Sequence, residues 1–314
     1  MIRIMLHVLI LVSVFLLSSC QQDPIEQSGK QAESLLNKYE RLNPSDFFKN
    51  KLMEKPLHFL VVGVDSRGEK ESRADSIMIV QYSAEDRTVK VVSVMRDSYV
   101  EIPGYKQTYG KINLSYFLGG EKLLKETIQN NFGVNIDYTI TVDFHGFASV
   151  IDTIVPEGMN VEVSAEMIED MKFEMEAGEN TLHGEELLKY VRFRHDDQSD
   201  FGRVNRQQEI LLELKNKINE KINSINGVTQ LPDLVDTVIK NVKTDLSVGQ
   251  VFTLSSNLFL QPIEDIKTMR IPVTNGYSNK HDPHEGAVLE INFPKNQEML
   301  SEFFSDTMPV NEQN

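Results

Sequence analysis

The sequence is poor in cysteine, with Cys20 as the only one in 314 residues. A single cysteine excludes a disulfide framework within the chain. It also excludes the common zinc sites that need at least two thiolates. With 40% hydrophobic and 25% charged residues, the chain can build a packed core, and wholesale disorder is not expected.

Basic residues are scarce relative to acidic ones. Lys and Arg number 32 against 47 Asp and Glu, which gives a net charge of −15. A nucleic-acid binder needs Lys and Arg on its contact face to neutralise phosphates. We therefore expect no nucleic-acid partner, although local basic clusters can still form on an acidic chain.

Several nucleotide-binding and hydrolase motifs are missing. No G-x-G-x-x-G follows a predicted strand, and neither G-x-S-x-G nor H-E-x-x-H occurs. Residues 104–111, GYKQTYGK, approach a P-loop but carry one spacer too many, and Ile112 stands where Ser or Thr should bind the metal. The HDPHE stretch at 281–285 offers metal-ligand types, but Pro283 and Gly286 favour a polar surface loop.

Residues 1–19 have the pattern of a signal peptide. Arg3 precedes a mostly apolar stretch of about 14 residues, short of the about 20 that span a bilayer. Leu17-Ser18-Ser19-Cys20 resembles a bacterial lipobox, which predicts lipidation at Cys20. The alternative is an uncleaved anchor helix. Either places the remaining chain at the extracytoplasmic face of the cell membrane, with residues 20–55 as a tether and short helix.

Beyond this tether, β-rich and helical patterns alternate over residues 56–300 without a repeat or a strong internal boundary. Alternation predicts one α/β domain, a three-layer α/β/α sandwich with a central mixed β-sheet, followed by a tail at 301–314. We expect a hairpin turn at 85–87. Strands are predicted at 58–64, 76–82, 89–95, 137–142, 159–163 and 268–273, and helices at 31–39, 121–131, 144–153, 184–191, 204–225, 231–242 and 248–258.

Arginine and aspartate recur at the ends of the first three predicted strands. The set comprises Asp65 and Arg67 after the first strand, Arg73 and Asp75 before the second, and Arg96 and Asp97 after the third. Isolated exposed ion pairs contribute only about 0–1 kcal/mol, so repeating them would stabilise the fold poorly. The alternative is a phosphate site in which guanidiniums hold oxyanions and carboxylates hold Mg²⁺. The residues alone leave both interpretations open.

A second arginine cluster lies at 190–208, YVRFRHDDQSDFGRVNRQQ. Arg192 and Arg194 are two residues apart, which predicts that they share one side of an extended segment. Asp200 is a candidate N-cap of the next helix. The remaining candidates are Arg203 and Gln207, which share a face of that helix, and Arg206, which lies beside them or faces solvent. Guanidiniums gathered at a helix N-terminus favour an oxyanion site.

Taken in order along the chain, these motifs resemble the LytR–CpsA–Psr family. The motifs that carry the resemblance are Asp65-Ser66-Arg67, Arg73-Ala74-Asp75-Ser76, Ser93 to Ser98, Lys111-Ile112-Asn113, Leu182-His183-Gly184 and the run from Arg192 to Gln208. The resemblance covers roughly residues 56–225, over half of the chain. It implies an extracytoplasmic α/β/α domain with a hydrophobic pocket for a polyprenyl lipid. The family is usually anchored by a transmembrane helix, so the lipobox-like Cys20 puts the anchoring mode in doubt.

The resemblance also implies an activity and a set of site residues. The activity is transfer of an anionic glycopolymer, of teichoic acid or capsule type, from an undecaprenyl-pyrophosphate carrier to peptidoglycan. The phosphates would be held by Arg73, Arg96, Arg192, Arg194, Arg203 and Gln207. Asp65 and Asp75 would serve Mg²⁺ or the base role, so the expected catalytic residues are Asp75, Asp65 and Arg194. Two other functions remain open, a non-catalytic polyprenyl-phosphate-binding regulator and a polyprenyl-pyrophosphate hydrolase.

Overall fold

The computed structural model describes residues 54–65, 73–196, 199–223, 241–247, 250, 253–254, 257 and 263–305. The predicted signal peptide, Cys20, Arg67, the helix at 31–39 and most of the helices at 231–242 and 248–258 lie outside these residues. Among the described helices, none is both long enough and apolar enough to cross a membrane.

A six-stranded mixed sheet forms the middle of the domain. Its strand order is β10-β3-β2-β1-β6-β9. β2 pairs antiparallel with both β1 and β3, as the predicted hairpin requires, whereas β6 runs parallel to β1 and β10 runs parallel to β3. The strands are β1 (Leu57–Val64), β2 (Ala74–Ser83), β3 (Thr88–Val94), β6 (Tyr138–Asp143), β9 (Val242–Thr244) and β10 (Asp265–Ile271).

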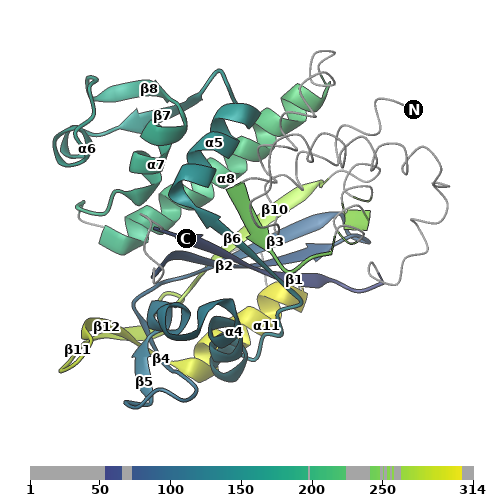
Figure 1. Ribbon diagram of the computed structural model, residues 1–314, viewed down its shortest axis with the longest axis vertical. Helices are drawn as coiled ribbons and strands as arrows, with labels where there is room; N and C mark the ends of the chain where they lie inside the picture. The colour runs from purple at the N-terminus through teal and green to yellow at the C-terminus, as the bar shows by residue number, and fades with distance from the viewer. Residues whose placement is uncertain are drawn as a thin grey trace, which may run out of the picture.

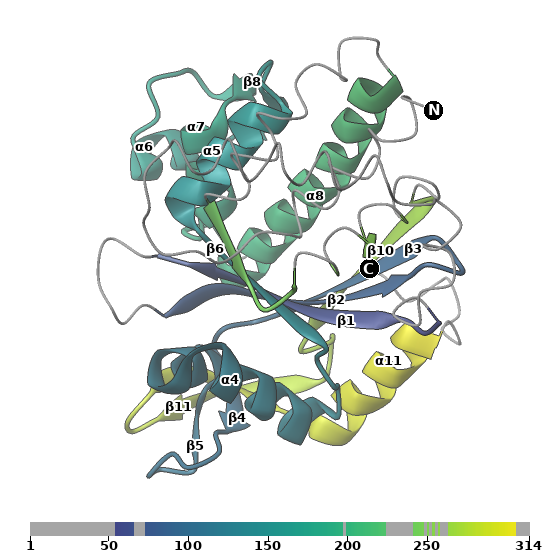
Figure 2. The ribbon, with the colours of Figure 1, turned by 45° about the vertical axis from the view of Figure 1, so that its right-hand side comes forward.

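Helices cover both faces of this sheet, which confirms the predicted three-layer α/β/α sandwich (Figures 1 and 2). One core lies between the sheet and α5, α7 and α8, and a second core fills the opposite side beneath α4 and α11. The strands of this sheet have nearly continuous apolar sequences because both faces of the sheet are buried. The helices are α4 (Ile112–Phe132), α5 (Phe144–Ile154), α7 (Gly184–Arg192), α8 (Ser199–Asn223) and α11 (Phe293–Ser305).

Smaller elements complete the domain. A second sheet has the order β11-β12-β4-β5 and lies on the α4 side. A two-stranded ribbon, β7 with β8, and the short helix α6 lie beside α7. Their bounds are β4 (Ser98–Glu101), β5 (Tyr109–Lys111), β7 (Met159–Val163), α6 (Ala165–Met171), β8 (Gly178–Leu182), β11 (Tyr277–Asp282) and β12 (Gly286–Ile291).

Several element boundaries differ from the sequence prediction, among them the start of α8 at Ser199 instead of 204. Helix α4 begins at Ile112, nine residues before the predicted start at 121, and kinks at Gly119 and Gly120. The φ of Gly120 is +62°, a conformation that favours glycine. Helix α11 continues to Ser305, so residues 301–305 of the predicted tail are helical.

The HDPHE stretch forms the turn between β11 and β12. Asp282 accepts hydrogen bonds from the backbone N–H groups of His284 and Glu285 and from the Tyr99 hydroxyl. These bonds lower the pKa of Asp282 below its usual value, with the backbone contributions largest. The residues act as turn formers, in line with the surface-loop interpretation.

Candidate functional site

Arg96 brings together carboxylates from separate parts of the chain. It follows β3, and its Nη1 donates to Oδ1 of Asp75, near the start of β2, at 2.7 Å. Its Nε lies 3.7 Å from both Asp97 Oδ2 and Asp200 Oδ1. Strand ends in α/β sheets converge in this way at ligand sites. The predicted convergence of strand-end residues is therefore present at this edge of the sheet.

Arg192 reaches the same edge from the helical layer. It is the last residue of α7, so the prediction that it lies in an extended segment is wrong. Its Cζ lies 4.0 Å from the centroid of the Phe144 ring at the start of α5, and its Nη2 lies 3.4 Å from Asp65 Oδ2. Stacking and pairing fix the guanidinium at the mouth between the sheet and the helices.

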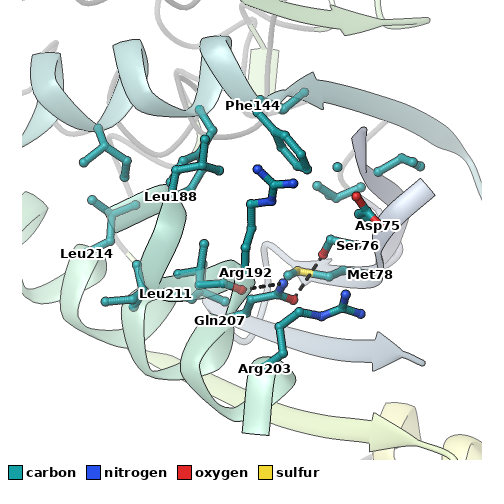
Figure 3. A pocket seen from close by; sticks show the side chains of 18 of the residues that line it. Asp75, Ser76, Met78, Phe144, Leu188, Arg192, Arg203, Gln207, Leu211 and Leu214 are labelled. Atoms are coloured by element: carbon teal, nitrogen blue, oxygen red, sulfur yellow. Dashed lines mark hydrogen bonds between the residues drawn. The ribbon is translucent and has the colours of Figure 1, made fainter. Parts of the chain in front are cut away.

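The N-terminal part of α8 supplies further side chains to the site. Helix α8 begins at Ser199, so Asp200 lies in its first turn instead of serving as the predicted N-cap. Asp200 Oδ1 is 2.9 Å from Arg203 Nη2. One turn on, the Gln207 carboxamide accepts from Ser76 Oγ at 3.2 Å and donates to the Val191 carbonyl at 3.3 Å (Figure 3). Gln207 thus joins β2, α7 and α8 at one point.

Burial dominates the electrostatics of this cluster. The Asp200 pKa is raised, because desolvation outweighs the opposing effects of Arg203 and Arg96. Desolvation likewise lowers the pKa of Arg203. Arg96 Nε and Arg203 Nε are buried without a hydrogen-bond partner. Such groups are unusual in a folded protein, and both arginines line the cavity that adjoins this cluster.

An apolar cavity of about 550 Å³ extends from this cluster between the sheet and the helices α5, α7 and α8. This volume is in the range typical of small-molecule sites. In Figure 3 the arginines and Asp75 lie toward one end, while leucines of α7 and α8 line the other. The apolar lining includes Met78, Val80, Val91, Phe147, Val150, Ile151, Leu188, Ile210, Leu211 and Leu214.

Six of the eight predicted site residues line this cavity: Asp75, Arg96, Arg192, Arg194, Arg203 and Gln207. Arg194 is exposed at its edge. Asp65 and Arg73 are not among the lining residues. Asp65 is joined to the site through Arg192, whereas exposed Arg73 lies 5.8 Å from the Phe117 ring centroid, on the α4 side. The cavity thus brings six of these residues together, whereas Asp65 and Arg73 lie outside its lining, and the roles of all eight stay predictions.

A profile of the LytR_cpsA_psr family matches residues 25–299. This chain belongs to that family.

Relatives in the family carry two kinds of name. "Regulatory protein MsrR" of Staphylococcus aureus is 37% identical over 250 residues, covering 80% of this chain and 75% of the relative. "Polyisoprenyl-teichoic acid--peptidoglycan teichoic acid transferase TagU" of Bacillus licheniformis is 32% identical, with 81% of each chain covered. The solved structure "TagT bound to LI-WTA" has a TM-score of 0.63 and 26% identity, covering 85% of this chain and 93% of that chain.

Within this family member, the carboxylates predicted to hold a divalent cation are paired with arginines. The two predicted ligands, Asp75 and Asp65, already contact Arg96 and Arg192. Among the described residues, no three His, Cys, Asp or Glu side chains are grouped to hold a metal ion. Mg²⁺ commonly binds through one or two carboxylates and completes its shell with phosphate oxygens and water. The residues therefore fit magnesium only together with a phosphate-bearing substrate.

Arg206, which sequence reasoning left undecided, is not among the residues that line the cavity. Its Nη1 lies 2.7 Å from Asp196 Oδ2, and its Nη2 donates to the Phe193 carbonyl at 2.5 Å. It is only 8% exposed. Arg206 therefore fixes the segment that joins α7 to α8, which carries Arg194, instead of meeting a ligand.

Three residues of the site were not predicted in their observed roles. Asp200 belongs to the charged cluster, Ser76 holds Gln207, and Phe144 lines the cavity beside Arg192. Ser76 adjoins the Arg73-to-Asp75 motif, and Phe144 directly follows a predicted strand. Position next to a strand end is the signal that identifies such residues.

Proposed function

We propose that this chain is a phosphotransferase that moves an anionic glycopolymer from an undecaprenyl-pyrophosphate carrier to peptidoglycan, with Mg²⁺, during cell-wall assembly. The observation that carries the proposal is the union of a guanidinium cluster and an apolar cavity in one site. A pyrophosphate joined to a polyprenyl chain has the same two parts. The names of TagU and of the TagT complex support this substrate class.

In this proposal each residue acts on a defined part of the donor. The lipid tail occupies the apolar cavity, while Arg96, Arg192 and Arg203 hold the two phosphates and Gln207 orients them. Phosphoryl transfer depends mainly on positioning and on stabilising charge that develops at the transferred group. Pre-placed guanidiniums supply both, since they already lie at the mouth of the cavity.

The transfer itself exchanges one P–O bond for another. A sugar hydroxyl of the acceptor attacks the polymer-side phosphorus, and the bond from this phosphorus to the bridging oxygen breaks, so that the lipid phosphate leaves. The hydroxyl proton passes to an aspartate, for which Asp75 is the first choice because it lines the cavity, and Asp65 the second. Mg²⁺ held by Asp75 or Asp65 and by the phosphates would neutralise the charge that builds on the leaving group.

The regulator name of MsrR favours a second candidate, a non-catalytic receptor for polyprenyl phosphates. The two functions are separated by turnover, because a receptor binds the donor without consuming it. A third candidate, the hydrolase, would release the polymer into solution instead of joining it to glycan. We propose the transferase because aspartates accompany the arginines at the mouth, and a pure anion receptor gains nothing from them.

Anchoring is part of the proposal. Lipidation at Cys20 would hold the domain at the extracytoplasmic face of the membrane, where the polyprenyl carrier lies. A labelled fatty acid fed to growing cells should then be incorporated into the parent and not into a Cys20→Ala protein, as measured by immunoprecipitation. A parent that takes up no label would favour an uncleaved anchor helix.

The role of the arginines is tested with Arg194→Ala. Arg194 is exposed, so its loss should leave the fold intact. By analogy with single oxyanion donors, its removal should raise the barrier by about 2–4 kcal/mol, about 30-fold to 1,000-fold in rate. Polymer transfer from a synthetic lipid-linked donor measures this, with Arg87→Ala, at an exposed pair with Glu264, as control. An Arg194→Ala protein as active as the parent would refute the assigned role.

A further inference from the structure

The second sheet has one face packed on the core and one face that is partly exposed. Along β4, Ser98 and Val100 are fully buried and point into the core, so Tyr99 and Glu101 point outward. The neighbouring strands follow the same alternation: Glu290 is paired in register with Tyr99, and Tyr109 with Glu101. We define the tyrosine face as the outward-pointing side chains of Tyr99, Glu101, Tyr109, Lys280 and Glu290.

Two aromatic rings form the centre of the tyrosine face. The rings of Tyr99 and Tyr109 stack with centroids 5.7 Å apart. Tyr99 is fixed from below by its hydrogen bond to Asp282 at 2.8 Å, and Lys280 Nζ lies 5.4 Å from its ring centroid. Tyr109 remains 40% exposed. Because tyrosine joins an apolar ring to a polar hydroxyl, this stacked pair suits a ligand that has both apolar and polar parts.

The tyrosine face is connected to Arg96 by the residues that follow β3. Asp97 separates Arg96 from β4 in the chain, its Oδ1 pairs with Lys111 Nζ at 2.7 Å, and its carbonyl accepts from Leu289 of β12. Figure 2 shows β4, β5 and β11 on the opposite side of the central sheet from α5 and α7. Lys111, paired in register with Tyr99, therefore links the tyrosine face to Arg96 through Asp97, on the side of the central sheet away from α5 and α7.

The charges on this side of the sheet select the class of ligand. Lys280 Nζ is 2.5 Å from Glu290 Oε1, and Lys111 is paired with Asp97, so both lysines are already neutralised. Exposed Glu101 adds negative charge. A phosphate-rich polymer would be repelled here. A neutral sugar chain fits, since the apolar faces of its rings stack on tyrosine and its hydroxyls donate to carboxylates.

We propose that the tyrosine face binds the neutral glycan backbone of the acceptor and delivers its hydroxyl to the phosphates at Arg96. The identity of the acceptor as peptidoglycan glycan rests on the proposed function. The lipid-linked donor then enters from the α5 and α8 side, and the acceptor from the β4 and β5 side. Opposed entry lets both substrates occupy the site at once, which direct transfer requires.

The test is binding of the full-length protein, in detergent, to cell-wall sacculi stripped of anionic polymers. Tyr109→Ala should weaken binding about tenfold, as loss of a central aromatic contact does. Tyr109→Phe, which keeps the ring, should bind as the parent does. Leu212→Ala is the matched control, because Leu212 has a similar exposure, 39%, but lies on α8. Equal binding by Tyr109→Ala and the parent, or preference of the parent for free anionic polymer, would overturn the proposal.

Two further readouts separate this proposal from the proposed function. In a transfer assay, Tyr109→Ala should raise KM for the acceptor and leave donor binding unchanged. A parent protein that transfers no polymer would count against the transferase, yet the sacculus-binding comparison would still decide the role of the tyrosine face. Unfolding midpoints in urea for all variants show whether any loss of binding comes from loss of the fold.

Discussion

Arg203 Nη2 lies 2.9 Å from Asp200 Oδ1 within the first turn of α8, and both side chains are buried. The pair places a carboxylate inside a cluster of guanidiniums, while burial raises the pKa of that carboxyl group. A carboxyl group with a raised folded-state pKa holds its proton longer in the folded protein than in the unfolded chain. Its contribution to stability is therefore largest in acid and is lost as the pH rises.

This relationship predicts a pH-dependent difference between the parent and Asp200→Asn. From about pH 3.9 up to the raised folded-state pKa, the unfolded chain ionises first, so the stability of the parent relative to the variant should fall. Urea unfolding of both proteins at a series of pH values measures the difference. A parent that gains stability relative to the variant as the pH rises would contradict the assignment.

The cavity is tested by two adjacent leucines of α8. Leu211 lines the cavity, whereas Leu212 is exposed and does not. Leu211→Trp should fill space that the lipid tail needs and weaken donor binding about tenfold or more, since excluded apolar groups lose their burial. Leu212→Trp should bind the donor as the parent does. Titration with a fluorescent polyprenyl pyrophosphate compares the affinities of the two variants. Equal affinities would show that the lipid tail does not bind in this cavity.

Arg206 is predicted to matter for stability. Arg206→Ala would leave the Asp196 carboxylate and the Phe193 carbonyl without their partner and should lower the free energy of unfolding by about 1–3 kcal/mol. Arg87→Ala, which removes only an exposed pair with Glu264, should change it by about 0–1 kcal/mol. Urea unfolding of both variants measures the contrast. Equal losses would mean that the α7–α8 segment does not depend on Arg206.

The sequence predicted the parts of the fold that have strong hydrophobic patterns. β1, β2 and β3 are apolar runs buried on both faces, and α5, α7 and much of α8 follow helical periodicity. β4 and β5 were missed because strands of four and three residues give almost no alternation. The start of α4 was missed because Gly119 and Gly120 interrupt its periodicity.

For the site, strand-end position and motif order predicted six of the charged and polar residues that line the cavity. Arg96 and Asp75 meet because adjacent antiparallel strands bring their ends together. Side-chain direction could not be predicted in the same way. Arg192 and Arg206 depend on where α7 stops and how the next residues turn, and Arg73 points to Phe117 on the far side of the sheet.

The most direct test of the central claim is product analysis with a labelled, lipid-linked glycopolymer donor, stripped sacculi as acceptor, and Mg²⁺ present or chelated. The account predicts label joined covalently to the glycan, released lipid phosphate in equal amount, and loss of both products on chelation. Label released as free polymer, in place of label joined to glycan, or a donor that is bound and never consumed, would contradict it.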